Sequence, residues 1–277
     1  MRISLLQMTS SDDPQQNLGT LRDMLAQARD EGADMALTPE VSNCVSMDRA
    51  HQQTVLHPEA SDPFVAGLGA TAGDFGLWVL AGSVAVKSDP PETRFANRSL
   101  LFDAAGRIAA RYDKMHMFDV EVSAQETYRE SAGFAPGERA VLAQTPWATL
   151  GLTICYDLRF AYLYRALAQA GAQVLTVPAA FSTGTGPDHW QPLLQARAIE
   201  TGCFVLAPAQ TGTHAARQGK ARRTYGHSMV IAPWGEVLLD AGTTLGVYTL
   251  DLDMGAVDDA RRRVPALTHD RSFAGPA

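Results

Sequence analysis

The chain has 277 residues, of which 46% are hydrophobic and 19% charged, a composition that excludes an intrinsically disordered protein. Its formal net charge of -7 argues against a surface that neutralises nucleic-acid phosphates. No proline-rich, glycine-rich or charge-rich stretch interrupts the chain, so we predict a single domain over residues 1–277.

The amino-terminal segment lacks the continuous apolar run of a signal peptide, because Gln7 and Thr9 interrupt it. No later run has the length that spans a bilayer. Three cysteines, Cys44, Cys155 and Cys203, are too few and too scattered for a disulfide framework or a zinc site. We therefore expect a cytoplasmic protein with neither a nucleic-acid nor a membrane partner.

The first half of the chain alternates strand and helix patterns. Apolar runs predict strands over residues 2–8 and 34–38, and the apolar spacing between them predicts a helix that begins after Asp13 and ends at Gly32. A second helix is predicted over 63–75, followed by strands over 77–86, 98–102 and 107–112. Glu40 and Lys114 each follow one of these strands closely.

Residues 115–138 are polar and longer than an ordinary connection, and we predict an irregular loop that borders a site. In the second half, strands are predicted over 147–154, 174–178 and 203–207, with helices from Cys155 to about residue 170 and over 189–201. Hairpin strands are predicted over 226–232, 237–240 and 246–250. This order indicates an α/β fold with two stacked mixed sheets and helices outside.

Cys155 lies at a predicted turn from a strand into a helix. A thiol at the start of a helix feels the positive end of the peptide dipoles and can lose its proton near neutral pH, which makes it a nucleophile. The alternative is a buried apolar cysteine, the interpretation that we give to Cys44 and Cys203. Taken alone, Glu40, Lys114 and Glu130 are equally compatible with solvated or ion-paired surface residues.

Three ordered segments of the chain resemble the three signature blocks of the nitrilase, or carbon–nitrogen hydrolase, superfamily. They are residues 37–40 (Leu-Thr-Pro-Glu), 112–116 (Tyr-Asp-Lys-Met-His) and 151–160 (Gly-Leu-Thr-Ile-Cys-Tyr-Asp-Leu-Arg-Phe). The similarity continues through residues 180–181, 185–190, 196–201 and 225–230, which look most like the Nit branch, whose members include deaminated-glutathione amidase and ω-amidase. Residues 129–131 resemble the second-glutamate segment of that branch.

The resemblance implies a four-layer αββα sandwich, usually dimeric, with a Glu-Lys-Cys triad and no cofactor. Carried onto this sequence, the triad is Glu40, Lys114 and Cys155. Cys155 would attack the carbonyl carbon, Glu40 would transfer protons, and Lys114 with the backbone N–H of Tyr156 would stabilise the oxyanion. Glu130 would orient Lys114.

Four further positions are candidates for contact with substrate. Arg159 could bind a substrate carboxylate or brace the turn through Asp157. Phe181, Thr185 and His189 would line the pocket on the strength of the resemblance, although Phe181 is equally plausible in the core. The seven histidines form no metal-binding pair of the HxxxH or HExxH type, so we expect no metal.

The implied activity is that of a cysteine-dependent amidase. Its substrate would be a small carboxylate-bearing amide, either deaminated-glutathione-like or an α-keto acid ω-amide, cleaved at a non-peptide C–N bond with release of ammonia through a thioester. An N-carbamoyl-amino-acid hydrolase or a nitrilase with the same triad is the alternative among enzymes. The alternative outside enzymes is a catalytically silent scaffold.

Overall fold

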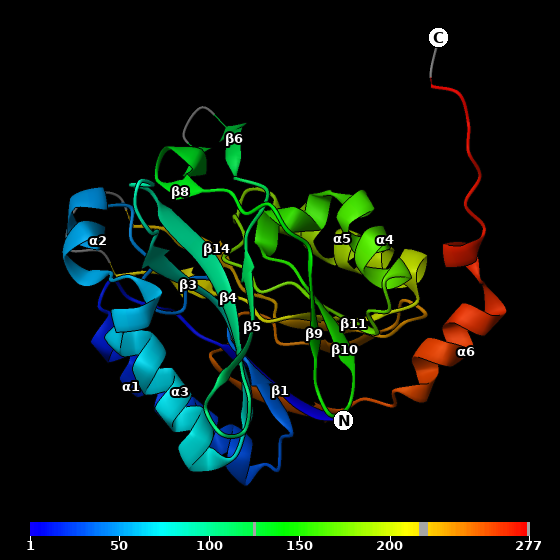
Figure 1. Ribbon diagram of the computed structural model, residues 1–277, viewed down its shortest axis with the longest axis horizontal. Helices are drawn as coiled ribbons and strands as arrows, with labels where there is room; N and C mark the ends of the chain where they lie inside the picture. Colours follow the sequence, from blue (N-terminus) through cyan, green and yellow to red (C-terminus); the bar gives the residue numbers. More distant parts are fainter. Residues whose placement is uncertain (124–125, 216–220, 276–277) are drawn as a thin grey trace.

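The computed structural model describes residues 1–123, 126–215 and 221–275. Two mixed β-sheets stack face to face, with helices on both outer sides (Figure 1). This arrangement confirms the predicted four-layer αββα sandwich.

The first sheet has seven strands in the order β17-β1-β2-β3-β4-β5, with β8 paired to β4. Strands β1, β2 and β3 run parallel, whereas β17, β4 and β5 are antiparallel to the strands they join. The bounds are β1 (Arg2–Gln7), β2 (Met35–Leu37), β3 (Trp78–Lys87), β4 (Phe95–Phe102), β5 (Ile108–Asp113), β8 (Phe134–Ala135) and β17 (Gly246–Asp251).

The second sheet has six strands in the order β16-β15-β12-β11-β10-β9. Its strands are β9 (Val141–Gln144), β10 (Thr149–Leu152), β11 (Val174–Thr176), β12 (Phe204–Ala207), β15 (Met229–Ile231) and β16 (Val237–Asp240). Two separate antiparallel pairs are formed by β6 (Asp119–Ser123) with β7 (Glu126–Arg129), and by β13 (Thr211–Thr213) with β14 (Arg223–Tyr225).

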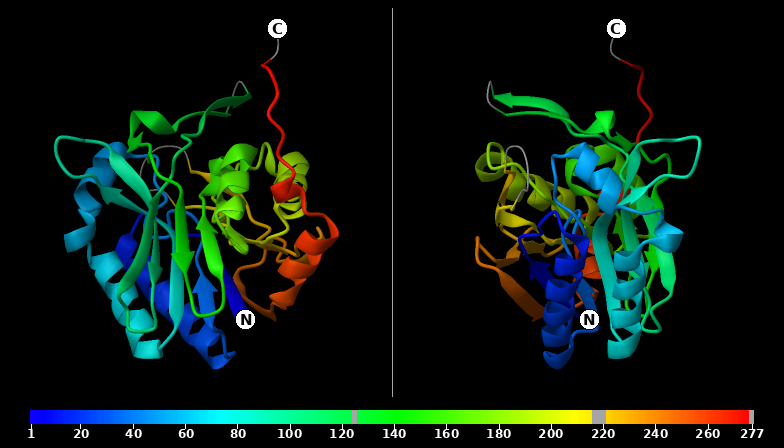
Figure 2. Two further views of the ribbon diagram at one scale, coloured as in Figure 1. Left: turned by 45° about the vertical axis from the view of Figure 1, so that its right-hand side comes forward. Right: turned by 90° about the vertical axis from the view of Figure 1, so that its left-hand side faces the viewer.

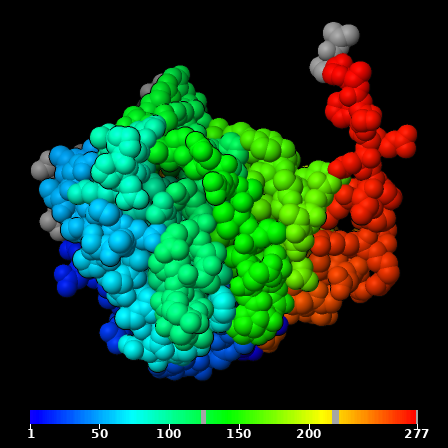
Figure 3. Space-filling model, in the orientation of Figure 1, coloured from blue at the N-terminus to red at the C-terminus, as the bar shows by residue number. Residues whose placement is uncertain are grey.

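Paired helices cover the outer face of each sheet (Figures 1 and 2). Helices α1 (Pro14–Asp30) and α3 (Pro63–Phe75) lie side by side on the first sheet, and α4 (Ala161–Gln169) and α5 (Gly186–Thr201) lie on the second. The remaining helices are α2 (Arg49–Val55), α6 (Gly255–Arg263) and the short 3-10 turns η1 (Glu59–Ser61), η2 (Glu130–Ala132), η3 (Cys155–Arg159) and η4 (Ala266–Thr268). Residues 269–275, red in Figure 3, extend away from the body of the molecule.

The alternation of side chains along the inner strands explains the layering. In β1, Ile3 and Leu5 pack into the core shared with the second sheet, whereas Leu6 packs into the core shared with α1 and α3. Neighbouring strand residues point to opposite faces, so a strand with apolar residues on both faces is buried between two layers. In the described part of the chain, no helix combines the length and apolar character that crossing a bilayer requires.

Three details of the predicted elements are wrong. Residues 246–250 form β17, which leaves the neighbouring hairpin and pairs with β1 in the other sheet. Within 115–138, the described residues include the β6–β7 hairpin rather than an irregular loop. The helix predicted from Cys155 is split into η3 and α4, because Phe160 adopts a non-helical conformation (φ -109°, ψ 80°) between them.

Candidate active site

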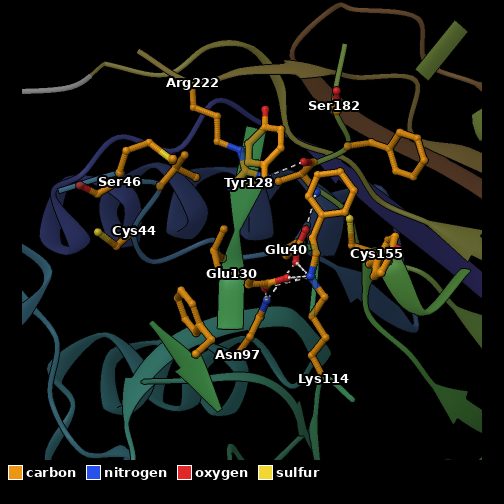
Figure 4. A pocket seen from close by; sticks show the side chains of 18 of the residues that line it. Glu40, Cys44, Ser46, Asn97, Lys114, Tyr128, Glu130, Cys155, Ser182 and Arg222 are labelled. Atoms are coloured by element: carbon orange, nitrogen blue, oxygen red, sulfur yellow. Dashed lines mark hydrogen bonds and ion pairs between the residues drawn. The ribbon is translucent and has the colours of Figure 1, made fainter. Parts of the chain in front are cut away.

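The three residues of the expected triad follow the carboxyl ends of three strands. Glu40 comes after β2, Lys114 directly after β5 and Cys155 after β10. Although they are far apart in the sequence, the fold brings all three to the wall of one pocket between the sheets (Figure 4). All three side chains are buried, with Glu40, Lys114 and Cys155 only 4%, 2% and 8% exposed.

The ammonium of Lys114 is held between two carboxylates. Lys114 Nζ donates to Glu40 Oε1 at 2.9 Å and to Glu130 Oε1 and Oε2 at 3.0 and 2.9 Å. Asn97 Nδ2 donates to the same Glu40 oxygen at 2.9 Å, and the backbone N–H of Ala180 donates to Glu40 Oε2 at 2.8 Å. Both oxygens of Glu40 are therefore fixed by hydrogen bonds, which orients the carboxylate in the pocket.

These contacts decide the charge states of the pair. Burial alone would raise the pKa of Glu40, but the nearby charges of Lys114 and Arg222 outweigh it and lower the pKa to about 2. Burial alone would lower the pKa of Lys114, but the carboxylates of Glu130 and Glu40 outweigh it and raise the pKa. The site thus holds an ionised carboxylate and an ionised ammonium side by side at neutral pH.

Cys155 is the first residue of η3, in the turn that follows β10, and its backbone is left-handed (φ 47°). Such a conformation is uncommon for residues other than glycine and is often found at functional sites. Burial and the neighbouring Glu40 carboxylate raise the pKa of the Cys155 thiol well above its ordinary value. These two effects act against the ionisation expected from a helix start, and η3 spans only five residues, so the charge state of the resting thiol stays a prediction to be tested.

A buried aspartate holds this turn in place. Asp157 Oδ2 accepts hydrogen bonds from the backbone N–H of Ile154 at 2.9 Å and from the Tyr112 hydroxyl at 2.7 Å. Asp157 Oδ1 accepts from the backbone N–H of His116 at 3.1 Å and lies 2.6 Å from His116 Nδ1. The sequence left open whether Arg159 braces the turn through Asp157; in the structure Tyr112 and His116 do so.

The pocket is a cavity of about 110 Å³. Of the four predicted substrate contacts, Phe181 and Thr185 line it, whereas Arg159 and His189 are not among its lining residues. Arg159 Nη2 lies 3.2 Å from His189 Nδ1 instead. The described residues contain no cluster of His, Cys, Asp or Glu side chains that could hold a metal ion.

Several lining residues were not singled out from the sequence. Asn97 is a buried polar residue in β4, and a polar residue inside an apolar strand is the signal that could have revealed it. Tyr128 and Arg222 come from β7 and from the residue before β14, segments whose sequence carries no comparable signal. Glu130, from the 115–138 segment, lies at Lys114 as the resemblance implies.

The family model for carbon-nitrogen hydrolases matches residues 2–262. The chain belongs to the carbon–nitrogen hydrolase family. Similar curated proteins are the deaminated glutathione amidases of Synechocystis sp. (39% identical, covering 95% of this chain and 96% of the relative), Yersinia enterocolitica (36%, covering 97% and 92%) and Homo sapiens (36%, covering 97% and 82%).

Solved structures give the same assignment. This carbon–nitrogen hydrolase superposes on the C. elegans NitFhit protein with a TM-score of 0.88 at 32% identity, over 98% of this chain and 65% of that one. Saccharomyces cerevisiae Nit3 gives a TM-score of 0.85 at 26% identity, over 99% of this chain and 97% of that one. The amidase from Nesterenkonia sp. AN1, which has acrylamide added at its active-site cysteine in one structure, gives 0.77 at 29% identity, over 96% and 98%. The chain is therefore an amidase-type enzyme of the nitrilase fold rather than a silent scaffold.

Proposed function

We propose that this carbon–nitrogen hydrolase cleaves deaminated glutathione or a closely related ω-amide of an α-keto acid, with Cys155 as the nucleophile. The observation that carries the proposal is the buried cluster in which Glu40, Lys114 and Cys155 converge on one pocket. The names of the curated relatives support the substrate class. An N-carbamoyl amino acid is the alternative substrate.

In the first half-reaction, the sulfur of Cys155 bonds to the carbonyl carbon while its proton passes to Glu40. This coupled transfer suits a resting thiol beside an ionised carboxylate. Lys114 and the backbone N–H of Tyr156 stabilise the negative charge on the tetrahedral oxygen, and each such donor typically contributes about 3 kcal/mol to the transition state. The C–N bond then breaks, and Glu40 returns the proton to the departing nitrogen.

In the second half-reaction, a water attacks the thioester carbonyl and gives a proton to Glu40. The C–S bond breaks, the acid product leaves, and the proton returns to Cys155. Throughout both steps Glu130 keeps the ammonium of Lys114 oriented, since it accepts two of that group's hydrogen bonds. The same oriented ammonium therefore serves both tetrahedral intermediates.

The leaving group distinguishes the candidate substrates. In glutathione the γ-amide nitrogen belongs to cysteine, so cleavage there in the deaminated compound releases a dipeptide amine and not the ammonia expected from the sequence. A primary ω-amide releases ammonia, and an N-carbamoyl amino acid releases ammonia, carbon dioxide and the free amino acid. Assays that follow ammonia alone would therefore overlook the first substrate, and the acid product must be measured for all three.

The test is a side-by-side assay of deaminated glutathione, α-ketoglutaramate and an N-carbamoyl amino acid, together with intact-protein mass spectrometry. Cys155→Ala is expected to lose activity and to form no acyl adduct. Cys203→Ala serves as the matched control, because Cys203 is buried and is not among the residues that line the pocket. Full activity of Cys155→Ala would refute the mechanism. Preference for the N-carbamoyl compound would replace the proposed substrate.

We further propose that the chain works as a single domain, forms a homodimer and resides in the cytoplasm. The family model extends over residues 2–262, which supports one domain. Large apolar side chains exposed around a hollow between α5 and α6 support self-association. All three cysteines are free, which agrees with a reducing compartment.

A further inference from the structure

A second cation enters the pocket opposite the triad. Arg222 lies on the pocket wall, and in Figure 4 its side chain points toward Tyr128 from the side opposite Lys114. Arg222 Nη2 donates to the carbonyl oxygen of Ala180 at 2.8 Å, while the N–H of the same Ala180 donates to Glu40 at 2.8 Å. One residue thus links the guanidinium to the carboxylate of the triad.

The guanidinium of Arg222 differs from Lys114 in its partners. Lys114 contacts two carboxylates, whereas in the described part of the chain no carboxylate lies within ion-pair distance of Arg222. Its Nε is buried and, among described residues, has no hydrogen-bond partner. A guanidinium has five N–H donors, and leaving a buried charged donor unpaired is unfavourable. A ligand that carries a hydrogen-bond acceptor would pair with this guanidinium.

The other unpaired buried polar atoms are in the same place. Within the described residues, the buried side-chain atoms that lack a partner are Asn97 Oδ1, Thr185 Oγ1 and Arg222 Nε, and all three residues line this pocket. Buried polar groups in proteins are normally satisfied by the protein, by ordered water or by a ligand, so these three atoms supply polar contacts for a ligand that enters the cavity. A ligand that satisfies Arg222 must bring an acceptor, and a carboxylate matches the planar guanidinium best.

The charges of the pocket favour an anion as well. Four of its lining residues are cationic, namely Arg49, Lys114, Arg129 and Arg222, and two are carboxylates, Glu40 and Glu130, so the four positive and two negative side chains leave a net charge of +2. Arg49 also lines the pocket, but its side chain is exposed, donates to Gln52 Oε1 and lies over the Phe134 ring. Arg222 is half-buried and has no carboxylate partner among the described residues, so it is the cation of the pocket best placed to receive a negatively charged substrate group.

We propose that Arg222 binds a carboxylate of the substrate and makes the enzyme selective for anionic amides. The inference rests on the proposed amidase function and assigns to Arg222 the role that the sequence suggested for Arg159. Because this contact is made in the ground state as well as in the transition state, its loss acts mainly on KM rather than on kcat.

The first test compares α-ketoglutaramate with a neutral amide of similar length, such as pentanamide. In Arg222→Met, the ratio of kcat/KM for the anionic amide to that for the neutral amide is expected to fall about 10- to 100-fold, the effect of a hydrogen bond to a charged group. Arg222→Lys, which keeps the charge, is expected to recover part of this ratio. Arg22→Met, at an exposed arginine of α1, controls for the loss of one positive charge.

The outcomes separate the inference from its alternatives. If kcat/KM in Arg222→Met falls equally for both amides, Arg222 only supports Glu40 through Ala180, and the inference is overturned. An unchanged ratio in Arg222→Met, with a lowered ratio in Arg159→Met, would overturn it in favour of Arg159. A selective rise in KM for the anionic amide supports it.

A binding measurement keeps the inference separate from the proposed reaction. Calorimetric titration of the Cys155→Ala protein with 2-oxoglutarate needs no turnover. Binding that weakens about 10- to 100-fold in Cys155→Ala/Arg222→Met supports the carboxylate site even if the wild type hydrolyses neither amide. Binding that is unchanged by the second substitution would overturn the site even if hydrolysis is observed.

Discussion

The hydroxyl of Tyr112 donates a 2.7 Å hydrogen bond to the carboxylate of Asp157, and both side chains are buried. Tyr112 lies in β5, two residues before Lys114, and Asp157 lies two residues after Cys155. The bond therefore crosses between the sheets and joins the segment that carries the ammonium to the turn that carries the thiol. It fixes the distance between two groups that, in the proposed mechanism, act on one carbonyl.

Tyr112→Phe removes this bond and nothing else from the side chain. We expect the free energy of unfolding to fall by about 1–2 kcal/mol, because Asp157 Oδ2 keeps only the N–H of Ile154 as a donor. We also expect kcat to fall with little change in KM, since the triad loses its spacing while the substrate contacts stay. Urea denaturation and steady-state kinetics measure the two effects.

Tyr164→Phe is the matched control for that substitution. Tyr164 is also fully buried, and its hydroxyl bonds Thr153 Oγ1 at 2.6 Å. Its removal should cost a similar amount of stability and reduce kcat much less. Equal losses of kcat in the two variants would mean that loss of core stability, rather than the Tyr112–Asp157 bond, lowers the activity.

Glu40→Gln tests the proton-transfer role. The amide preserves the shape of the side chain but cannot take the thiol proton, so kcat/KM is expected to fall about 10²- to 10⁴-fold. Glu59→Gln is a suitable control, because Glu59 is a partly buried glutamate that pairs with Arg98 and Arg111 away from the pocket. A Glu40→Gln enzyme with near wild-type turnover would remove Glu40 from the mechanism.

The ionisation of Cys155 can be followed directly. Because burial and Glu40 raise the pKa of this thiol, the resting enzyme is expected to hold a protonated sulfur at neutral pH, with thiolate forming only above the ordinary range of cysteine. The ultraviolet absorbance difference between wild type and Cys155→Ser should then show no thiolate step between about pH 5 and about pH 8. A step in that range would restore the helix-dipole explanation.

The helices and strands of the layered fold could be predicted because the signals that begin and end each element lie in neighbouring residues. The helix over Pro63–Phe75 has a capping Asp62, a proline at its start and Gly76 at its end, and it has the predicted bounds. The partner of β17 depends on contacts across the whole chain, so a turn-like neighbourhood wrongly placed it in the second-sheet hairpin. Local sequence patterns therefore predict where a strand or helix lies in the chain better than they predict which strand it pairs with.

The residues of the site also divide into those that the sequence could predict and one that it could not. Glu40, Lys114 and Cys155 could be proposed because each lies in a short signature segment. They meet because the strands that precede them, β2 and β5 in one sheet and β10 in the other, end at the same pocket. Arg222 could not be proposed, since its importance comes from the absence of a carboxylate partner among described residues and from its bond to Ala180. Neither property can be read from the residues beside it.

The proposed homodimer predicts a specific interface. Ile199, Trp234 and Val264 are 60%, 43% and 55% exposed and line one hollow, an arrangement more typical of a contact surface than of a monomer's exterior. Light scattering should give a dimer for the wild type and a folded monomer for Ile199→Asp with Val264→Asp. Leu245→Asp, an equally exposed residue outside that hollow, should remain dimeric. A dimer that survives the double substitution would place the interface elsewhere.

Gly82 is expected to be indispensable to the geometry around Glu40. A Cβ atom on Gly82 would lie 1.9 Å from the carbonyl oxygen of Thr38 and 2.8 Å from that of Pro39, the residues that lead into Glu40. The backbone cannot shift that far without moving the carboxylate of Glu40. Gly82→Ala should therefore lower the free energy of unfolding by about 3 kcal/mol or more, and should also reduce activity.

Gly19→Ala provides the opposite expectation for the same chemical change. Gly19 lies within α1, where an added Cβ meets nothing within 4 Å, so alanine should stabilise the helix by about 0.5–1 kcal/mol. Urea denaturation of both variants measures the contrast. If Gly82→Ala unfolds at the same urea concentration as the wild type, the close approach of β3 to the Thr38–Pro39 backbone is not what positions Glu40.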